Sequence, residues 1–176
     1  VVYKRQSFYL THQRMATRSM RGLLPTQRIS GSDLTIKGKA PCRENLDSLA
    51  RQLEQELAPD ADPSQVVSTL THLLFQQEHF RGNQKNYLDP DNSYLNKVLE
   101  NKTGLPITLS VLCVLVANRL GLPIVGVGMP GHYIVKYKLP KNSIYFDPFH
   151  QGRMLSHSDC IQIVEQFGQT FEEHFL

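Results

Sequence analysis

Two segments in the first half of the chain carry apolar residues at helical spacing. Between Arg43 and Leu57 the apolar residues are three or four positions apart and alternate with acidic and amide side chains, which predicts an amphipathic helix. A second segment with this spacing begins at Pro63 and reaches about His79. Asp62 is expected to cap this second helix, and Pro63 to occupy its first position, where a missing N–H does no harm.

One of the later helices is predicted to be buried on most of its surface. Residues 88–92 are turn formers, and Asp91 or Asn92 is expected to cap a short helix at residues 94–99. Pro106 then opens a helix whose apolar side chains point in almost every direction. Such a helix must be covered on most sides, so we predict that it is the central helix of the domain.

The sequence then changes to strand patterns. Residues 122–127, 132–139 and 143–147 are short runs rich in β-branched and aromatic side chains, which are typical of strands. The Pro-Lys-Asn turn at residues 140–142 predicts an antiparallel hairpin, and Ser156 is expected to cap a closing helix. Helices followed by strands indicate an α+β fold, with a helical N-terminal half and a buried central helix packed on a small antiparallel sheet.

Charge divides the chain into two parts. Residues 1–39 contain eight lysines and arginines against Asp33 alone, whereas residues 40–176 contain 11 basic and 15 acidic side chains. We therefore expect a domain at residues 40–176 and a basic leader that is disordered or not native to it. A transit peptide, a nucleic-acid-binding arm and translated upstream sequence all fit the leader. We favour the third, because the leader has no long apolar run and does not begin with Met.

The cysteines and the apolar stretches narrow the class of protein. Cys42, Cys113 and Cys160 are odd in number, widely spaced and without a C-x-x-C motif, so we predict neither a disulfide framework nor a zinc knuckle. A reducing, cytoplasmic location is expected. The most apolar stretch, residues 106–120, is too short and too often interrupted by polar residues to span a membrane.

Two residues of the predicted sheet are candidates for a catalytic pair. His132 and Asp147 are expected on neighbouring strands, where a carboxylate fixes the tautomer of an imidazole and stabilises its protonated form. His132 shares its strand face with Ile134 and two lysines, so a solvated surface histidine is the competing interpretation. Gly131 allows a close backbone approach before His132, and Pro148 holds Asp147 extended.

Five motifs, spread over a match of about residues 43–170, carry a resemblance. They are Phe80-Arg81-Gly82-Asn83, Tyr87-Leu88-Asp89-Pro90-Asp91-Asn92-Ser93-Tyr94-Leu95, Gly104-Leu105-Pro106-Ile107-Thr108-Leu109-Ser110, Gly128-Met129-Pro130-Gly131-His132-Tyr133 and Phe146-Asp147-Pro148-Phe149. Together they resemble the bacterial SirB-type branch of the transglutaminase-like superfamily. The resemblance implies a papain-like fold, in which a cysteine at the start of the central helix attacks an acyl carbon while His and Asp from adjacent strands assist.

The resemblance assigns two of the three catalytic positions to chemically suitable residues. His132 matches the family histidine and Asp147 the family aspartate. Counting back from residues 121–123, which look like the Gly-Ile-Pro that ends the superfamily's central helix, places Pro106 in the cysteine's position. Proline offers no nucleophile, so the chain is expected to be a pseudoenzyme, and whether any catalysis survives stays open.

Two residues of the central helix are candidates for a displaced nucleophile. Ser110 and Cys113 share a helical face with Pro106, but they lie about 6 Å and about 10 Å further along the axis. Burial at the depth of Cys113 raises the pKa of a thiol. For Ser110 the competing interpretation is a small side chain packed under the sheet.

A metal site made of His132, Asp147 and His150 is another chemical option, since imidazole and carboxylate groups bind zinc and other divalent ions. The spacing of these residues matches no known metal signature. We therefore predict no metal and no cofactor.

Four further residues are candidates for ligand binding because they belong to the motifs that carry the resemblance. They are Asn83, Asn92, Tyr94 and Gly131. For the two asparagines, turn geometry and capping are the main interpretation and ligand contact is the alternative.

Three functions follow from these observations. The first is a non-catalytic or regulatory domain that binds a peptide or protein partner in the cleft around His132 and Asp147. The second is an acyl-transferase or hydrolase that combines this pair with Ser110, Cys113 or a metal-held water. The third, nucleic-acid binding through the leader, lacks aromatic interleaving and any motif, and the domain itself is acidic.

Overall fold

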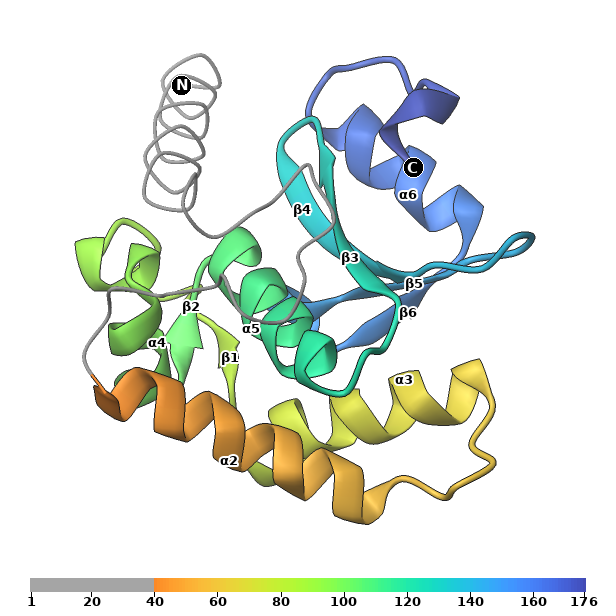
Figure 1. The fold of residues 1–176 in the computed structure, drawn as a ribbon. Coiled ribbons are helices and arrows are strands. Elements are labelled where there is room, and N and C mark those ends of the chain that lie inside the picture. The colour runs from red at the N-terminus through yellow and green to blue at the C-terminus, as the bar shows by residue number, and fades with distance from the viewer. Residues whose placement is uncertain (1–39) are drawn as a thin grey trace.

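The computed structural model describes residues 40–176, and the chain folds as an α+β domain (Figure 1). The α-helices are α2 (Ala40–Glu56), α3 (Pro63–Thr71), α4 (Leu95–Asn101), α5 (Pro106–Arg119) and α6 (His157–Gln166). The strands are β1 (Arg81–Gly82), β2 (Thr103–Gly104), β3 (Ile124–Met129), β4 (His132–Tyr137), β5 (Ile144–Asp147) and β6 (Arg153–Leu155). The predicted basic leader lies outside the described residues.

The second predicted helix is present as α3 followed by a π-helical turn over His72–Gln77. Asp62 caps it as expected, because its Oδ1 accepts the N–H groups of Ser64 and Gln65 at 2.8 and 2.9 Å. The Gln65 side chain accepts the Asp62 N–H in return, at 2.8 Å. This reciprocal capping box satisfies donors that a helix start leaves unpaired.

Helix α5 is the central helix that its all-round apolar pattern predicts. It contacts α2 on one side and strands β3 and β4 on the other, and Figure 1 shows it between α2 and the sheet. Its C-terminal end is anchored by Arg119, which donates to the Asp47 carboxylate of α2 at 2.6 Å and to the Leu115 carbonyl at 2.7 Å.

The main sheet has four antiparallel strands in the order β3-β4-β5-β6. The predicted hairpin is β4–β5, with Val135 opposite Phe146. Both of these residues are fully buried in the core that α5 shares with α2 and α3. Strand β6 and the short parallel pair β1–β2 were not predicted, because segments of two or three residues give no periodic signal.

The face of β4 that carries His132 is buried, which contradicts the competing interpretation of a solvated surface histidine. Ile134 on this face is fully buried, and it belongs to a second apolar cluster with Cys160 and Val164 of α6. The alternation along β4 left this question open, because it does not reveal whether the second side of the sheet is covered. Helix α6 covers the other side, and its placement depends on tertiary packing rather than on the pattern of β4.

The predicted cap of α4 was also wrong. Tyr94 is the N-cap residue of α4 and makes no side-chain capping bond. Asp91 lies in a 3₁₀ turn over Pro90–Ser93 that Asp89 caps instead. Asn92 points inward and donates to main-chain carbonyls of the preceding loop, so tertiary hydrogen bonds displaced the local capping preference.

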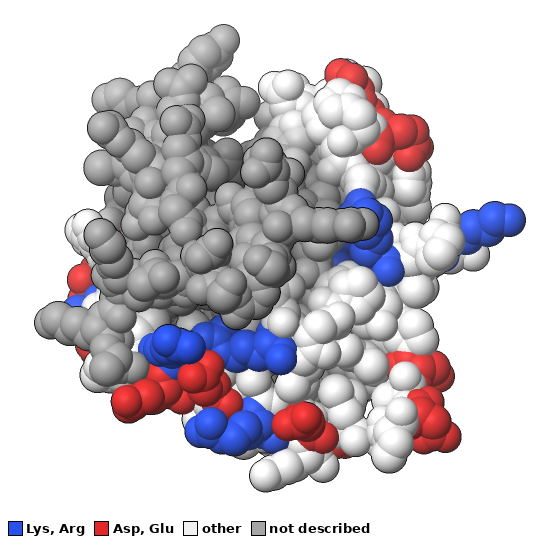
Figure 2. Space-filling model, viewed as in Figure 1, with Lys and Arg blue, Asp and Glu red and all other residues white. Residues whose placement is uncertain are grey.

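None of the helices among the described residues is long and apolar enough to cross a membrane. On the face drawn in Figure 2, acidic and basic side chains of the described residues are interspersed along the lower edge, where α2 and α3 lie. This part of that face therefore shows no continuous basic stripe of the kind typical of nucleic-acid-binding surfaces.

Candidate functional site

The hairpin places His132 and Asp147 beside each other. His132 begins β4 and Asp147 ends β5, and in an antiparallel pair the start of one strand lies next to the end of the other. His132 Nε2 is 2.7 Å from Asp147 Oδ2. Both side chains are buried, with 8% and 2% of their surfaces exposed. The predicted geometry of the pair is therefore confirmed, and the surface-histidine interpretation is wrong.

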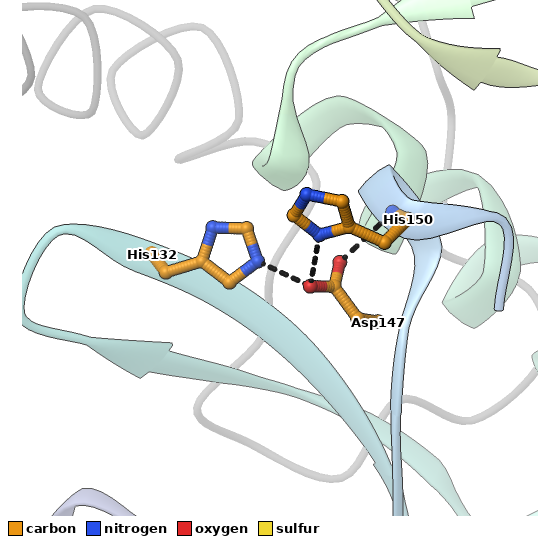
Figure 3. Close-up of side chains that lie close together, drawn as sticks. All are labelled: His132, Asp147 and His150. Carbon is orange, nitrogen blue, oxygen red and sulfur yellow. Dashed lines mark hydrogen bonds and ion pairs between the residues drawn. The ribbon is translucent and has the colours of Figure 1, made fainter. Parts of the chain in front are cut away.

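Asp147 also contacts a second histidine. Its Oδ2 lies 2.7 Å from His150 Nδ1, and its Oδ1 accepts the N–H groups of Phe149 and His150 at 2.9 and 3.3 Å. Asp147 is thus the N-cap of a 3₁₀ turn over Pro148–His150. Figure 3 shows the two imidazole rings converging on one carboxylate oxygen from two different elements.

These contacts favour the ionised form of the Asp147 carboxyl group and determine which histidine nitrogens donate to it. Burial alone raises the pKa of Asp147, but the hydrogen bonds from His132 and His150 outweigh it, and the pKa of the carboxyl group lies below its ordinary value. An ionised carboxylate only accepts hydrogen bonds. His132 Nε2 and His150 Nδ1 therefore donate to Asp147 Oδ2, and Nδ1 of His132 is the ring nitrogen that does not face the carboxylate.

The pair opens into a cleft of about 370 Å³ between the start of α5, the end of β5 and helix α6. Pro106, the first residue of α5, lies in its wall. The described residues that line it are Tyr87, Pro106, His132, Asp147, Phe149, His150, Arg153, Leu155, Asp159, Gln162, Ile163, Gln166 and Phe167.

The structure does not bring the candidate nucleophiles to this cleft. Ser110 is fully buried, and its hydroxyl lies 3.5 Å from the Tyr133 carbonyl under the sheet. Cys113 is also fully buried, and burial raises the pKa of its thiol far above the ordinary value. Neither residue lines the cleft. Burial also raises the pKa of Cys160 to about 11.

The two candidate asparagines form an internal hydrogen-bond network. Asn83 Nδ2 donates to Asn92 Oδ1 at 2.9 Å, and Asn92 Nδ2 donates to the carbonyls of Asn86 and Tyr87 at 2.8 and 3.2 Å. These contacts give both residues the turn-shaping role expected for asparagine. Tyr94 is 53% exposed and lies outside the cleft lining. A ligand-binding role for these three residues stays a prediction.

Gly131, the fourth binding candidate, borders the site through its backbone. Its φ of +78° suits glycine, and a Cβ atom there would lie within 2.5 Å of three ring atoms of Phe167. The expected close approach at Gly131 is thus made by the ring of a cleft residue.

Helix α6 supplies one wall of the cleft, and the sequence patterns did not predict it. Gln162 and Gln166 lie four residues apart on α6 and both line the cleft, so they share a helical face. Arg153 of β6 lines it too, and it pairs with Asp159 at 2.7 Å. The i, i+4 spacing of the glutamines was a readable signal, but which face of α6 meets the site depends on the fold.

A buried helix packed on an antiparallel sheet, with a His–Asp pair beside the helix start, defines a domain of the transglutaminase-like class. The family model of the transglutaminase-like superfamily matches residues 40–176. The chain belongs to this superfamily, as its motifs predict.

Several known proteins are similar to parts of the chain. A UPF0162 protein of Xylella fastidiosa is 43% identical over 89 residues, which cover 51% of this chain and 32% of that protein. Human F-box only protein 21 is 31% identical over 111 residues, or 58% of this chain and 18% of that protein. A UPF0162 protein of Pseudomonas aeruginosa is 29% identical over 136 residues, or 77% of this chain and 49% of that protein. The matches thus span less than half of each relative, and no solved structure matches the chain.

Proposed function

We propose that this chain is a non-catalytic transglutaminase-like domain that binds a peptide or protein in the cleft around His132 and Asp147. The observation that carries the proposal is the chemistry of the cleft wall. None of its described lining residues is a cysteine, serine or threonine, and Pro106 lies where α5 begins. All three cysteines of the chain are buried and unpaired, which also fits a reducing, cytoplasmic setting.

The cleft offers the contacts that a peptide requires. Leu155, Ile163 and Phe167 supply an apolar wall, and the exposed amides of Gln162 and Gln166 stand beside it. Amide side chains both donate and accept hydrogen bonds, so they match the N–H and C=O groups of a peptide backbone. Apolar walls with a few convergent polar groups are typical of binding sites.

The relatives support a role as a binding module. The matched region makes up 18% of human F-box only protein 21 and 32% of the Xylella protein. A domain of this kind is therefore found within longer chains, where a binding module acts alongside other segments.

One observation favours an alternative function. The His132–Asp147 hydrogen bond has the geometry of a catalytic pair, and an acyl-transferase or hydrolase could use it with Ser110 or Cys113. Both of these residues are fully buried and outside the cleft lining, so we favour the binding function.

Catalysis is tested by incubating the full chain with a glutamine-containing peptide and a primary-amine probe, and separately with peptide substrates for hydrolysis. We expect neither amine incorporation nor cleavage, with an active transglutaminase as positive control. Turnover that disappears in His132→Ala while the fold is kept would show that the domain is an enzyme and that the non-catalytic proposal is wrong.

Binding is tested by selecting peptides from a random displayed library against the full chain. The double variant Gln162→Ala/Gln166→Ala is expected to weaken a selected peptide at least about tenfold, because it removes two hydrogen-bonding side chains. The matched control is Gln55→Ala/Gln76→Ala, which removes two exposed glutamines outside the cleft lining. Failure to select any peptide, or equal affinity for both double variants, contradicts the proposed binding site.

A further inference from the structure

The side chains around Asp147 are arranged for more than a catalytic pair. One ring nitrogen of His132, one carboxylate oxygen of Asp147 and one ring nitrogen of His150 all lie within 4.8 Å of one another. In the classical pair a single histidine uses the carboxylate. Here a second histidine, whose side chain is 52% exposed, turns its Nδ1 toward the same buried oxygen instead of toward water.

Although the spacing of these residues along the sequence led us to predict no metal, their convergence in the structure changes that expectation. We propose that His132, Asp147 and His150 form a binding site for a divalent transition-metal ion such as Zn²⁺. Two imidazole nitrogens and one carboxylate oxygen are donors that zinc, cobalt and nickel accept. The inference goes beyond the proposed peptide binding and does not depend on it.

The carboxylate is positioned to act as a ligand through one oxygen. Oδ1 accepts the main-chain N–H groups of Phe149 and His150, which hold the carboxylate in place. Oδ2 faces the two imidazole rings (Figure 3). Hydrogen bonds of this kind orient metal ligands, and their loss typically weakens metal binding.

The change needed to admit the ion is small. The two N···O distances are 2.7 Å, whereas ligand atoms in a tetrahedral zinc site with bonds of about 2.1 Å lie roughly 3.4 Å apart. Each ligating nitrogen must therefore lie roughly 0.7 Å further from Asp147 Oδ2, and the half-exposed ring of His150 has room to move. A neutral imidazole binds a metal ion through the nitrogen that carries no proton. The ion therefore takes the place of the hydrogen on His132 Nε2 and His150 Nδ1, and each ring then carries its proton on its other nitrogen, Nδ1 of His132 and Nε2 of His150.

The charges around the cluster are compatible with a cation. Asp147 supplies a negative charge, and its pairing partner on β6, Arg153, supplies a positive one. The Arg153 guanidinium is paired with Asp159 at 2.7 Å, so its charge is largely offset. All three ligands line the cleft, which leaves further coordination positions open to water or to a carbonyl or carboxylate group.

The test uses the full chain, stripped with a chelator that is then removed. Titration with Co²⁺, followed by its visible absorption, and with Zn²⁺, followed by calorimetry, is expected to show one saturable site. His150→Ala should weaken Zn²⁺ binding at least about tenfold, and it is preferred over His132→Ala because His150 is exposed and its loss spares the core. Circular dichroism checks that each variant is folded.

The matched control is His157→Ala. His157 is also half exposed and also faces a carboxylate, Glu173, at 3.1 Å, but it lies outside the cluster. Its replacement should leave the affinity for Zn²⁺ unchanged. The absence of a saturable site, equal affinity in wild type and His150→Ala, or an equal loss in both variants overturns the proposal.

Discussion

Gly131 and Phe167 are in such close contact that a Cβ atom on Gly131 would lie 2.2 Å from Cγ of the Phe167 ring. Gly131 forms the turn before His132, and Phe167 follows the last turn of α6 and lines the cleft. This contact therefore sets the distance between α6 and the start of β4. It makes the width of the cleft depend on a glycine.

Gly131→Ala is expected to destabilise the domain by about 2–4 kcal/mol, because it adds strain at a positive φ and forces the Phe167 ring away. Chemical denaturation measures the decrease in the free energy of unfolding. The matched control is Gly168→Ala, which has a similar φ of +70° but no described atom within 4 Å of the added Cβ. Equal losses in both variants would show that the ring contact has no energetic role.

Thr108→Val is expected to destabilise the protein by about 1–3 kcal/mol. The buried Thr108 hydroxyl donates to the Asn92 carbonyl at 2.8 Å and accepts the Leu105 N–H at 2.9 Å, and valine leaves both groups unsatisfied. Thr69→Val is the control, since the Thr69 hydroxyl bonds only the Gln65 carbonyl on the surface. Denaturant unfolding compares the two, and a loss at Thr69 as large as that at Thr108 contradicts this account.

Asp147→Asn is expected to reduce stability at neutral pH by about 1–3 kcal/mol, with a chelator present to exclude metal. The pKa of Asp147 is depressed in the folded protein, so its carboxylate stabilises the fold above about pH 3.9 and loses this effect as the pH falls through the folded pKa. The difference in the free energy of unfolding between wild type and Asp147→Asn should therefore shrink as the pH is lowered. The control Asp60→Asn, in the exposed turn before α3, should unfold with the same free energy as wild type. If the difference between wild type and Asp147→Asn is the same at every pH, the ionisation of Asp147 does not contribute to stability as proposed.

The native thiols are expected to resist iodoacetamide at neutral pH. Cys42, Cys113 and Cys160 are at most 7% exposed, and burial raises the pKa of each. Mass spectrometry should find them unmodified until the chain is denatured. Rapid modification of Cys113 in the native state would restore it as a candidate nucleophile.

Pro106→Cys is expected to create a reactive thiol. The new side chain would stand at the N-terminal end of α5 in the wall of the cleft that holds His132, and a helix start together with a histidine lowers the pKa of a thiol. We expect alkylation at least about tenfold faster than in Lys141→Cys, which places a thiol on the exposed β4–β5 turn. A slower reaction than in Lys141→Cys would show that the cleft no longer activates a thiol.

The sequence predicted the parts of the fold that carry a strong local signal. The apolar surface of α5, the N-cap at Asp62 and the turn between β4 and β5 are local features, and each was found. The pairing of His132 with Asp147 followed from the hairpin they share. The structure agrees with the prediction at these elements because the hydrophobic pattern, the capping residue and the turn residues all favour the same local structure.

The features that the sequence did not predict depend on contacts between segments that are distant along the chain. Helix α6 covers the face of β4 that carries His132, so alternation along β4 could not decide between a buried and a solvated His132. Asn92 was expected to cap a helix, but it bonds carbonyls of its own loop instead. The cleft wall at Gln162 and Gln166 could not be placed before the position of α6 was known.

The hydrogen bonds of Asn92 have a further consequence for recognition. Its side chain bonds the Asn86 and Tyr87 carbonyls, and its own carbonyl accepts the Thr108 hydroxyl of α5. The segment that carries Tyr87 is thereby locked to the helix that carries Pro106, and two sides of the cleft form one rigid frame. A ligand that binds between these two sides does not have to order a mobile loop. The conformational entropy that such ordering would cost on binding has already been lost when the chain folds.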